Sequence, residues 1–109
     1  MDQENEKAMY DMADKFIDLA NEISKSESYG TIGVAIRYAA ARYSAFEASM
    51  RTNNLAEDKE KHLQFFAKTF TEMLQKNFEE YITLQSQNQG KLSKVESLNW
   101  LYRGNYPQI

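Results

Sequence analysis

Residues 54–85 read NLAEDKEKHLQFFAKTFTEMLQKNFEEYITLQ, and this stretch decides the fold of the chain. Its apolar side chains recur at steps of three and four residues, which is the period of an α-helix that buries one side. They are Leu63, Phe66, Ala67, Phe70, Met73, Leu74, Phe78, Tyr81 and Leu84. The opening Asn54-Leu55-Ala56-Glu57 has the form of a capping box with Asn54 as the cap. The stretch therefore predicts one helix over 55–86, about 50 Å long.

Two shorter helices are expected before this one. Over residues 4–25 an apolar face lies opposite an acidic face, which is typical of an amphipathic helix. A second helix is expected over 32–51. The polar stretch SKSESYG, residues 24–30, separates the two, and Ser28 or Thr31 is the candidate N-cap of the second helix. The sequence thus predicts an all-α protein, a three-helix antiparallel bundle with a long third helix.

The long third helix is expected to extend beyond the other two and to need a cover for its last apolar turns. We assign the helical domain to residues 1–86. The segment 87–109 is expected to form a short helix over 94–102 and a loose tail, because Ser93-Lys94-Val95-Glu96 again has the form of a capping box. Either this segment or a second subunit is expected to cover the long helix.

The composition fits one small helical domain and excludes several kinds of site. The chain has 109 residues with four glycines and one proline, few residues to form turns between strands. Cysteine is absent, which excludes disulfides, thiol catalysis and cysteine-ligated metal sites. The start MDQENEKAM is unlike a signal peptide, and no apolar run approaches the roughly 20 residues that cross a bilayer. We expect a soluble, cytoplasmic protein with no membrane partner.

The charge is acidic overall but unevenly distributed. The net charge is −3, with eight acids and three bases in residues 1–30 and one acid and three bases in residues 31–54. This contrast favours association of the first two segments, weakly where the charges are solvated. No segment carries the dense Lys/Arg stripe that binding to a phosphate backbone requires. We expect no nucleic-acid partner.

The middle helix is expected to have two apolar sides. One side mixes large and small residues suited to a core, namely Ile32, Ala35, Ile36, Ala39, Tyr43, Phe46 and Met50. The other side holds Val34, Tyr38, Ala41, Ala45 and Ala48, whose small members allow a second helix to approach closely. That second helix belongs either to the same chain or to a symmetry mate, because a two-fold interface uses the same patch on both chains.

Arg42 is the strongest candidate for a polar site. It is expected to project between the two apolar sides of the middle helix, with its stem buried and its guanidinium beside a ring. A largely buried arginine needs a carboxylate or carbonyl partner. The candidates within the chain are Asp18, Glu22 and Glu47, and a phosphate or carboxylate of a ligand is the alternative.

Three further aromatic or aliphatic residues are candidates for a contact surface. Phe65 points away from the apolar stripe of its helix, and together with Ile82 and Trp100 it suits a partner surface if folding brings the three together. With Tyr38, Ala41 and Ala45 they form the predicted interface set.

The sequence offers little for catalysis. Asp11, Asp14, Asp18 and Glu22 share one side of a helix, but a single helix does not surround a metal ion. The single histidine, His62, has no oriented partner in sight, so we expect it at the surface or the boundary. We predict no catalytic residue, no metal and no cofactor.

Three runs in the chain resemble a known family. They are ADKFIDLANEI (13–23), IRYAAARYSAFEA (36–48) and FFAKTFTEMLQKNFEEYI (65–82). They are similar to a small bacterial family of short helical proteins classed as a domain of unknown function, over about residues 10–85. The resemblance implies a bacterial, cytoplasmic, helical protein and brings no activity, cofactor or catalytic residue.

These observations rank three functions. The first is a non-enzymatic protein that associates with itself, as a homodimer, or with another protein. The second is a binding module in which an aromatic pocket and Arg42 hold an anionic small molecule. The third is an enzyme of unknown reaction.

Overall fold

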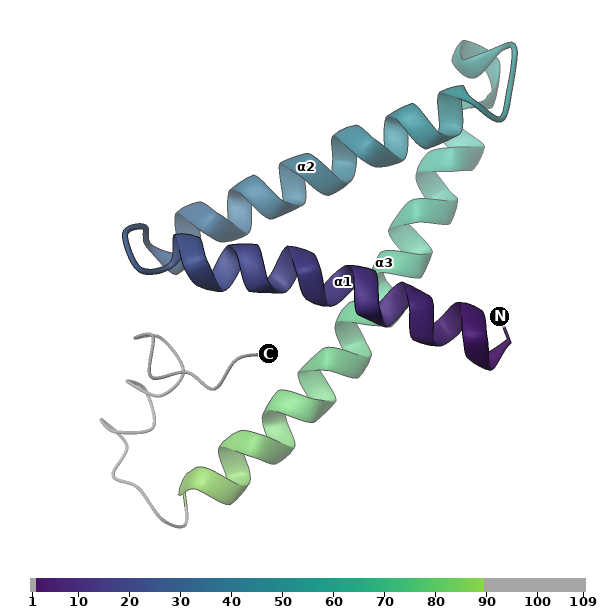
Figure 1. Cartoon of the computed structure of the whole chain (residues 1–109). Coiled ribbons are helices and arrows are strands. Elements are labelled where there is room, and N and C mark those ends of the chain that lie inside the picture. Colours follow the sequence, from purple (N-terminus) through teal and green to yellow (C-terminus); the bar gives the residue numbers. More distant parts are fainter. Residues whose placement is uncertain (1, 90–109) are drawn as a thin grey trace. The chain divides into compact units, whose positions relative to one another are not determined.

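The computed structural model describes the backbone of residues 2–89 and the side chains as far as residue 87. These residues form three helices and no strand: α1 (Gln3–Ile23), α2 (Tyr29–Ser49) and α3 (Leu55–Gln89) (Figure 1). The expected all-α class with a long third helix is confirmed. The short helix predicted over 94–102 and Trp100 lie outside the described residues.

α1 begins at an aspartate cap. The Asp2 side-chain Oδ1 accepts a hydrogen bond of 2.9 Å from the backbone N–H of Asn5, which satisfies one of the unpaired donors at the helix start. Glu4 and Glu6 in the first turn are placed favourably toward the positive end of the helix dipole. The helix ends at Ile23, where the hydroxyl of Ser24 donates to the carbonyl of Asn21.

α2 begins three residues earlier than the sequence indicates. The Ser28 hydroxyl accepts from the backbone N–H of Thr31 at 3.2 Å and therefore acts as the N-cap, so that the helix starts at Tyr29 instead of residue 32. Gly30 lies inside the first turn, in open space and without a nearby atom that would meet a Cβ. The position of the cap, and not the glycine, sets this boundary.

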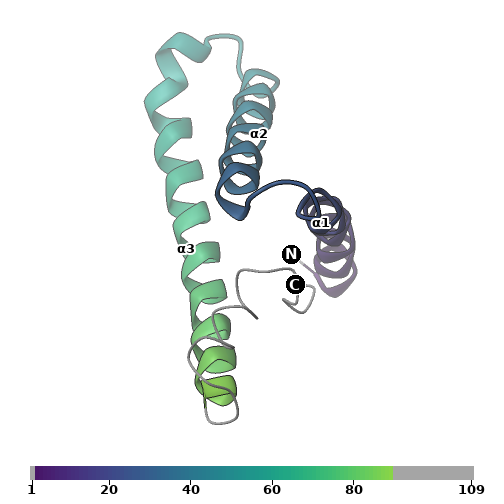
Figure 2. The same cartoon turned by 90° about the vertical axis from the view of Figure 1, so that its left-hand side faces the viewer.

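α3 begins where the sequence predicts it to begin. Asn54 Oδ1 accepts from the Glu57 backbone N–H at 3.3 Å, and the Asn54 side-chain amide donates to the Glu57 carboxylate at 2.7 Å. The Asn54 backbone N–H donates to Thr52 Oγ1, so a hydroxyl takes the place that the glutamate has in a full capping box. From this cap the helix runs without interruption for 35 residues (Figure 2).

The chain divides into two compact units between Ala35 and Ile36, inside α2. In the first unit the most buried apolar side chain is Ile32, with 8% exposed, and in the second it is Ala48, with 2% exposed. Each lies near one end of α2, next to a turn. Among the described residues these two are the only apolar side chains classed as buried. The described core is therefore confined to the neighbourhood of the two turns.

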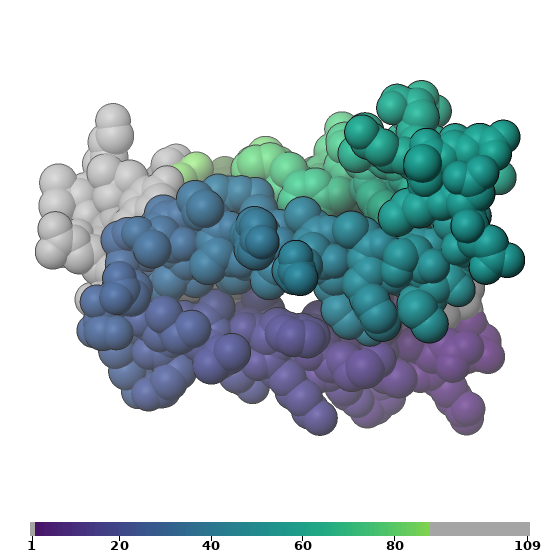
Figure 3. All heavy atoms as spheres, turned by 90° about the horizontal axis from the view of Figure 1, so that it is seen from above, coloured from purple at the N-terminus to yellow at the C-terminus, as the bar shows by residue number. Residues whose placement is uncertain are grey.

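The apolar faces expected to form a core are exposed. On α1, Phe16 keeps 73% of its surface and Leu19 58%; on α2, Tyr43 keeps 66%, and Met50, directly after α2, keeps 72%. The space-filling view shows side chains of α2 open on the face that it presents (Figure 3).

The ion pairs of the described chain act only within single helices or turns. They join Lys7 to Asp11, Lys25 to Glu22 and Arg51 to Glu47, each over three or four residues. Exposed pairs of this kind contribute about 0.3–0.5 kcal/mol each. They support individual helices and do not hold one helix against another.

Candidate functional site

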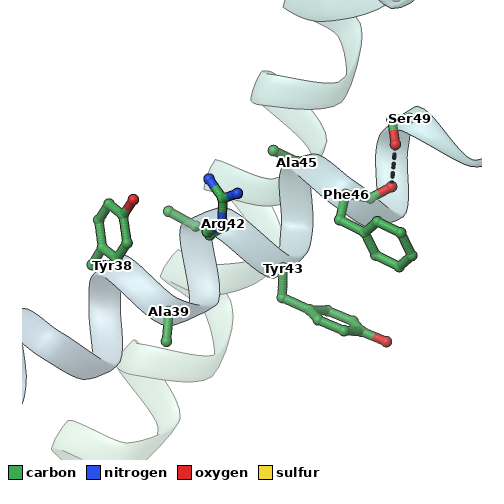
Figure 4. A pocket seen from close by; sticks show the side chains of 8 residues that line it. Tyr38, Ala39, Arg42, Tyr43, Ala45, Phe46 and Ser49 are labelled. Carbon is green, nitrogen blue, oxygen red and sulfur yellow. Dashed lines mark hydrogen bonds between the residues drawn. The ribbon is translucent and has the colours of Figure 1, made fainter.

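α2 carries a hollow of about 990 Å³ on its surface. Eight residues line it, all of them from this one helix: Tyr38, Ala39, Ala41, Arg42, Tyr43, Ala45, Phe46 and Ser49 (Figure 4). A pocket that encloses a small molecule takes its walls from several elements. The hollow is therefore an open surface and does not form a closed cavity.

The side chains around the hollow project in different directions. In Figure 4, Tyr38 and Arg42 extend to one side of α2 and Tyr43 to the other. The rings of Tyr43 and Phe46 are in tilted contact, with their centroids 5.7 Å apart. The Ser49 hydroxyl is not available to a ligand as a donor, because it donates to the Phe46 carbonyl at 2.6 Å. The polar groups that remain on the Tyr38 side are the guanidinium and the Tyr38 hydroxyl.

Arg42 is exposed in the structure, and the buried ion pair expected for it stays a prediction. Among the described residues it has no ion-pair partner, and the nearest candidate, Glu47, pairs with Arg51 at 3.1 Å. A guanidinium that stays hydrated avoids the large free-energy cost of desolvation, and its apolar neighbours on α2 leave it open to water. Its other predicted role, the anchor of an anionic ligand, stays a prediction.

The predicted interface set falls into separate groups. Tyr38, Ala41 and Ala45 line one hollow together and are exposed; we call them the alanine face. Phe65 and Ile82 are also exposed, at 55% and 63%, but they are 17 positions apart on α3, about 25 Å along the axis. They do not form one site with each other.

α3 has half-buried residues on two of its sides. Asp58, His62, Phe66 and Thr69 are half-buried and share one side of its N-terminal half. Five large apolar residues, which we call the α3 stripe, are exposed on a second side: Leu63, Phe70, Leu74, Phe78 and Ile82. Tyr81 and Gln85, near the end of the helix, are half-buried and fall in the same arc as this stripe. Summing about 100° per residue separates the centres of the two sides by more than 90°.

The part of the chain that the structure describes holds no cluster of side chains suited to binding a metal ion. No three of its histidine, aspartate and glutamate residues lie close enough together to hold a metal ion. The acidic row on α1 is exposed, and two of its members form local ion pairs, Asp11 with Lys7 and Glu22 with Lys25. His62 is half-buried and has neither a hydrogen bond nor an ion pair within the described residues. None of the described helices is both long and apolar enough to span a bilayer.

Comparison with known proteins identifies the family. No curated protein and no solved structure matches the chain. A family model matches residues 9–82, close to the range over which the sequence resembles a domain of unknown function. Because this match covers more than half of the chain, the protein belongs to the family described as Protein of unknown function (DUF3144).

Proposed function

We propose that the protein is a non-enzymatic association module whose first partner is a second copy of itself. One observation carries this proposal. Among residues 2–87, twenty large apolar side chains keep more than a third of their surface exposed. Aromatic side chains offer about 150–250 Å² each, so this exposed surface is on the order of 1,500–2,000 Å².

The exposed apolar surface is distributed over α1, α2 and α3, so only the part on one face can form a single interface. The largest apolar patch of a typical monomer is about 300–600 Å², and a standard interface buries about 800 Å² on each partner. The described chain therefore has enough apolar surface for an interface of standard size. Association also supplies the burial that the small core around Ile32 and Ala48 lacks.

The mass of the purified protein in solution tests this proposal. Light scattering at micromolar concentration is expected to give at least twice the chain mass of 12.7 kDa. A strict monomer at this concentration would contradict self-association.

A substitution in the alanine face tests its part in the assembly. Ala41→Glu or Ala45→Glu places a charge on a surface that a partner would cover, so the mass should fall while the helix content by circular dichroism stays unchanged. Ala56→Glu is the matched control, because Ala56 is exposed in the first turn of α3, where an acid is favourable. An unchanged mass for both alanine-face variants would remove this face from the interface.

A second candidate function is the binding of a small anion at the hollow on α2. Its support is that Arg42 has no ion-pair partner among the described residues and projects to the same side of α2 as Tyr38 (Figure 4). A thermal-shift screen with phosphate and di- and tricarboxylates at millimolar concentration tests it, with Arg42→Gln as the control. Stabilisation of the native protein that the variant loses would favour this function, and no stabilisation by any anion would rule it out.

A further inference from the structure

We draw no further inference here: the strongest candidate, the row of exposed apolar side chains Met12, Phe16, Leu19 and Ile23 on one side of α1, carries none because nothing in the described part of the chain shows what covers it.

Discussion

Phe65 and Phe78 offer a matched pair of substitutions that decides whether the α3 stripe is an interface. They are the same residue type on the same helix, and their exposed fractions are nearly equal, 55% and 58%. They are 13 positions apart, which at about 100° per residue places them about 140° apart around α3. In an isolated chain, Phe65→Ala and Phe78→Ala would have similar, small effects. In a dimer that pairs through the α3 stripe, only Phe78 is covered.

The expected size of the difference follows from the exposed area. Phe78 exposes roughly 115 Å², taking about 200 Å² for a phenylalanine side chain. If the partner covers half of this area, the burial contributes about 1.5 kcal/mol per copy at about 25 cal/mol per Å². Two copies give about 3 kcal/mol, or a hundred-fold change in Kd. Phe65 has an edge contact with Phe66, centroids 5.5 Å apart, so its loss costs about 1 kcal/mol of chain stability and leaves the Kd unchanged.

Sedimentation equilibrium over a hundred-fold range of concentration measures both values of Kd, and circular dichroism reports helix content in parallel. The expected result is a dimer weakened about a hundred-fold by Phe78→Ala and by less than three-fold by Phe65→Ala. Equal effects of the two substitutions would refute the assignment of the stripe. A larger effect of Phe65→Ala would instead support the interface set predicted from the sequence.

Further predictions concern the caps, the arginine and salt. Asn54→Ala should lower the free energy of unfolding by about 1 kcal/mol, because it removes the cap bonds to Glu57. Asn53→Ala is the control and should change the free energy of unfolding by less than 0.5 kcal/mol, because the Asn53 side chain has no hydrogen bond among the described residues. Urea unfolding at fixed protein concentration measures both. Arg42→Ala should change the free energy of unfolding by less than 0.5 kcal/mol, since this exposed side chain has no ion-pair partner among the described residues. If the substitution lowers the free energy of unfolding by more than 2 kcal/mol, Arg42 is buried in the assembly. Raising the salt from 0.05 to 0.5 M should change the Kd of the dimer by less than three-fold, since salt screens charges and an apolar interface depends on burial.

The helices of this protein could be predicted from its sequence because they depend on local interactions. Two local signals, the spacing of the apolar residues and the cap Asn54, predict that α3 starts at residue 55, and the structure has its start there. The sequence predicts the start of α2 at residue 32, because a glycine such as Gly30 is typical of the end of a loop, whereas the helix starts at Tyr29. A glycine in a first turn costs about 1 kcal/mol at most, and the hydrogen bond that Ser28 makes as the cap offsets that cost.

The candidate site could be predicted only in part, because burial depends on neighbours that are distant in sequence. The grouping of Tyr38, Ala41 and Ala45 follows from helical spacing, and the structure places them in one hollow. Arg42 is buried only if the rings of Tyr38 and Phe46, one helical turn on either side, enclose its side chain. The spacing of these residues in the sequence does not determine whether the rings do so. Likewise, the apolar stripe of α3 looked like one face, since a sequence does not state which part of a wide apolar arc another helix covers.

The two apolar surfaces of the second unit are unequal, and their sizes predict an order of assembly. The α3 stripe offers five large side chains, whereas the alanine face offers one, Tyr38, and two methyl groups worth about 0.8 kcal/mol each when buried. Pairing through α3 is therefore expected at lower concentration than any contact through the alanine face. Because the alanine face lies on α2, an α3 dimer still presents one such face on each copy.

This order makes the two classes of variant distinguishable by mass. If the alanine face forms a second contact, the parent protein should grow beyond the dimer as concentration rises, and Ala41→Glu should stop this growth at the dimer. Phe78→Ala should instead weaken the first step and shift the whole series to higher concentration. If Ala41→Glu yields monomers while Phe78→Ala leaves the dimer intact, the order is reversed and the alanine face is the primary interface.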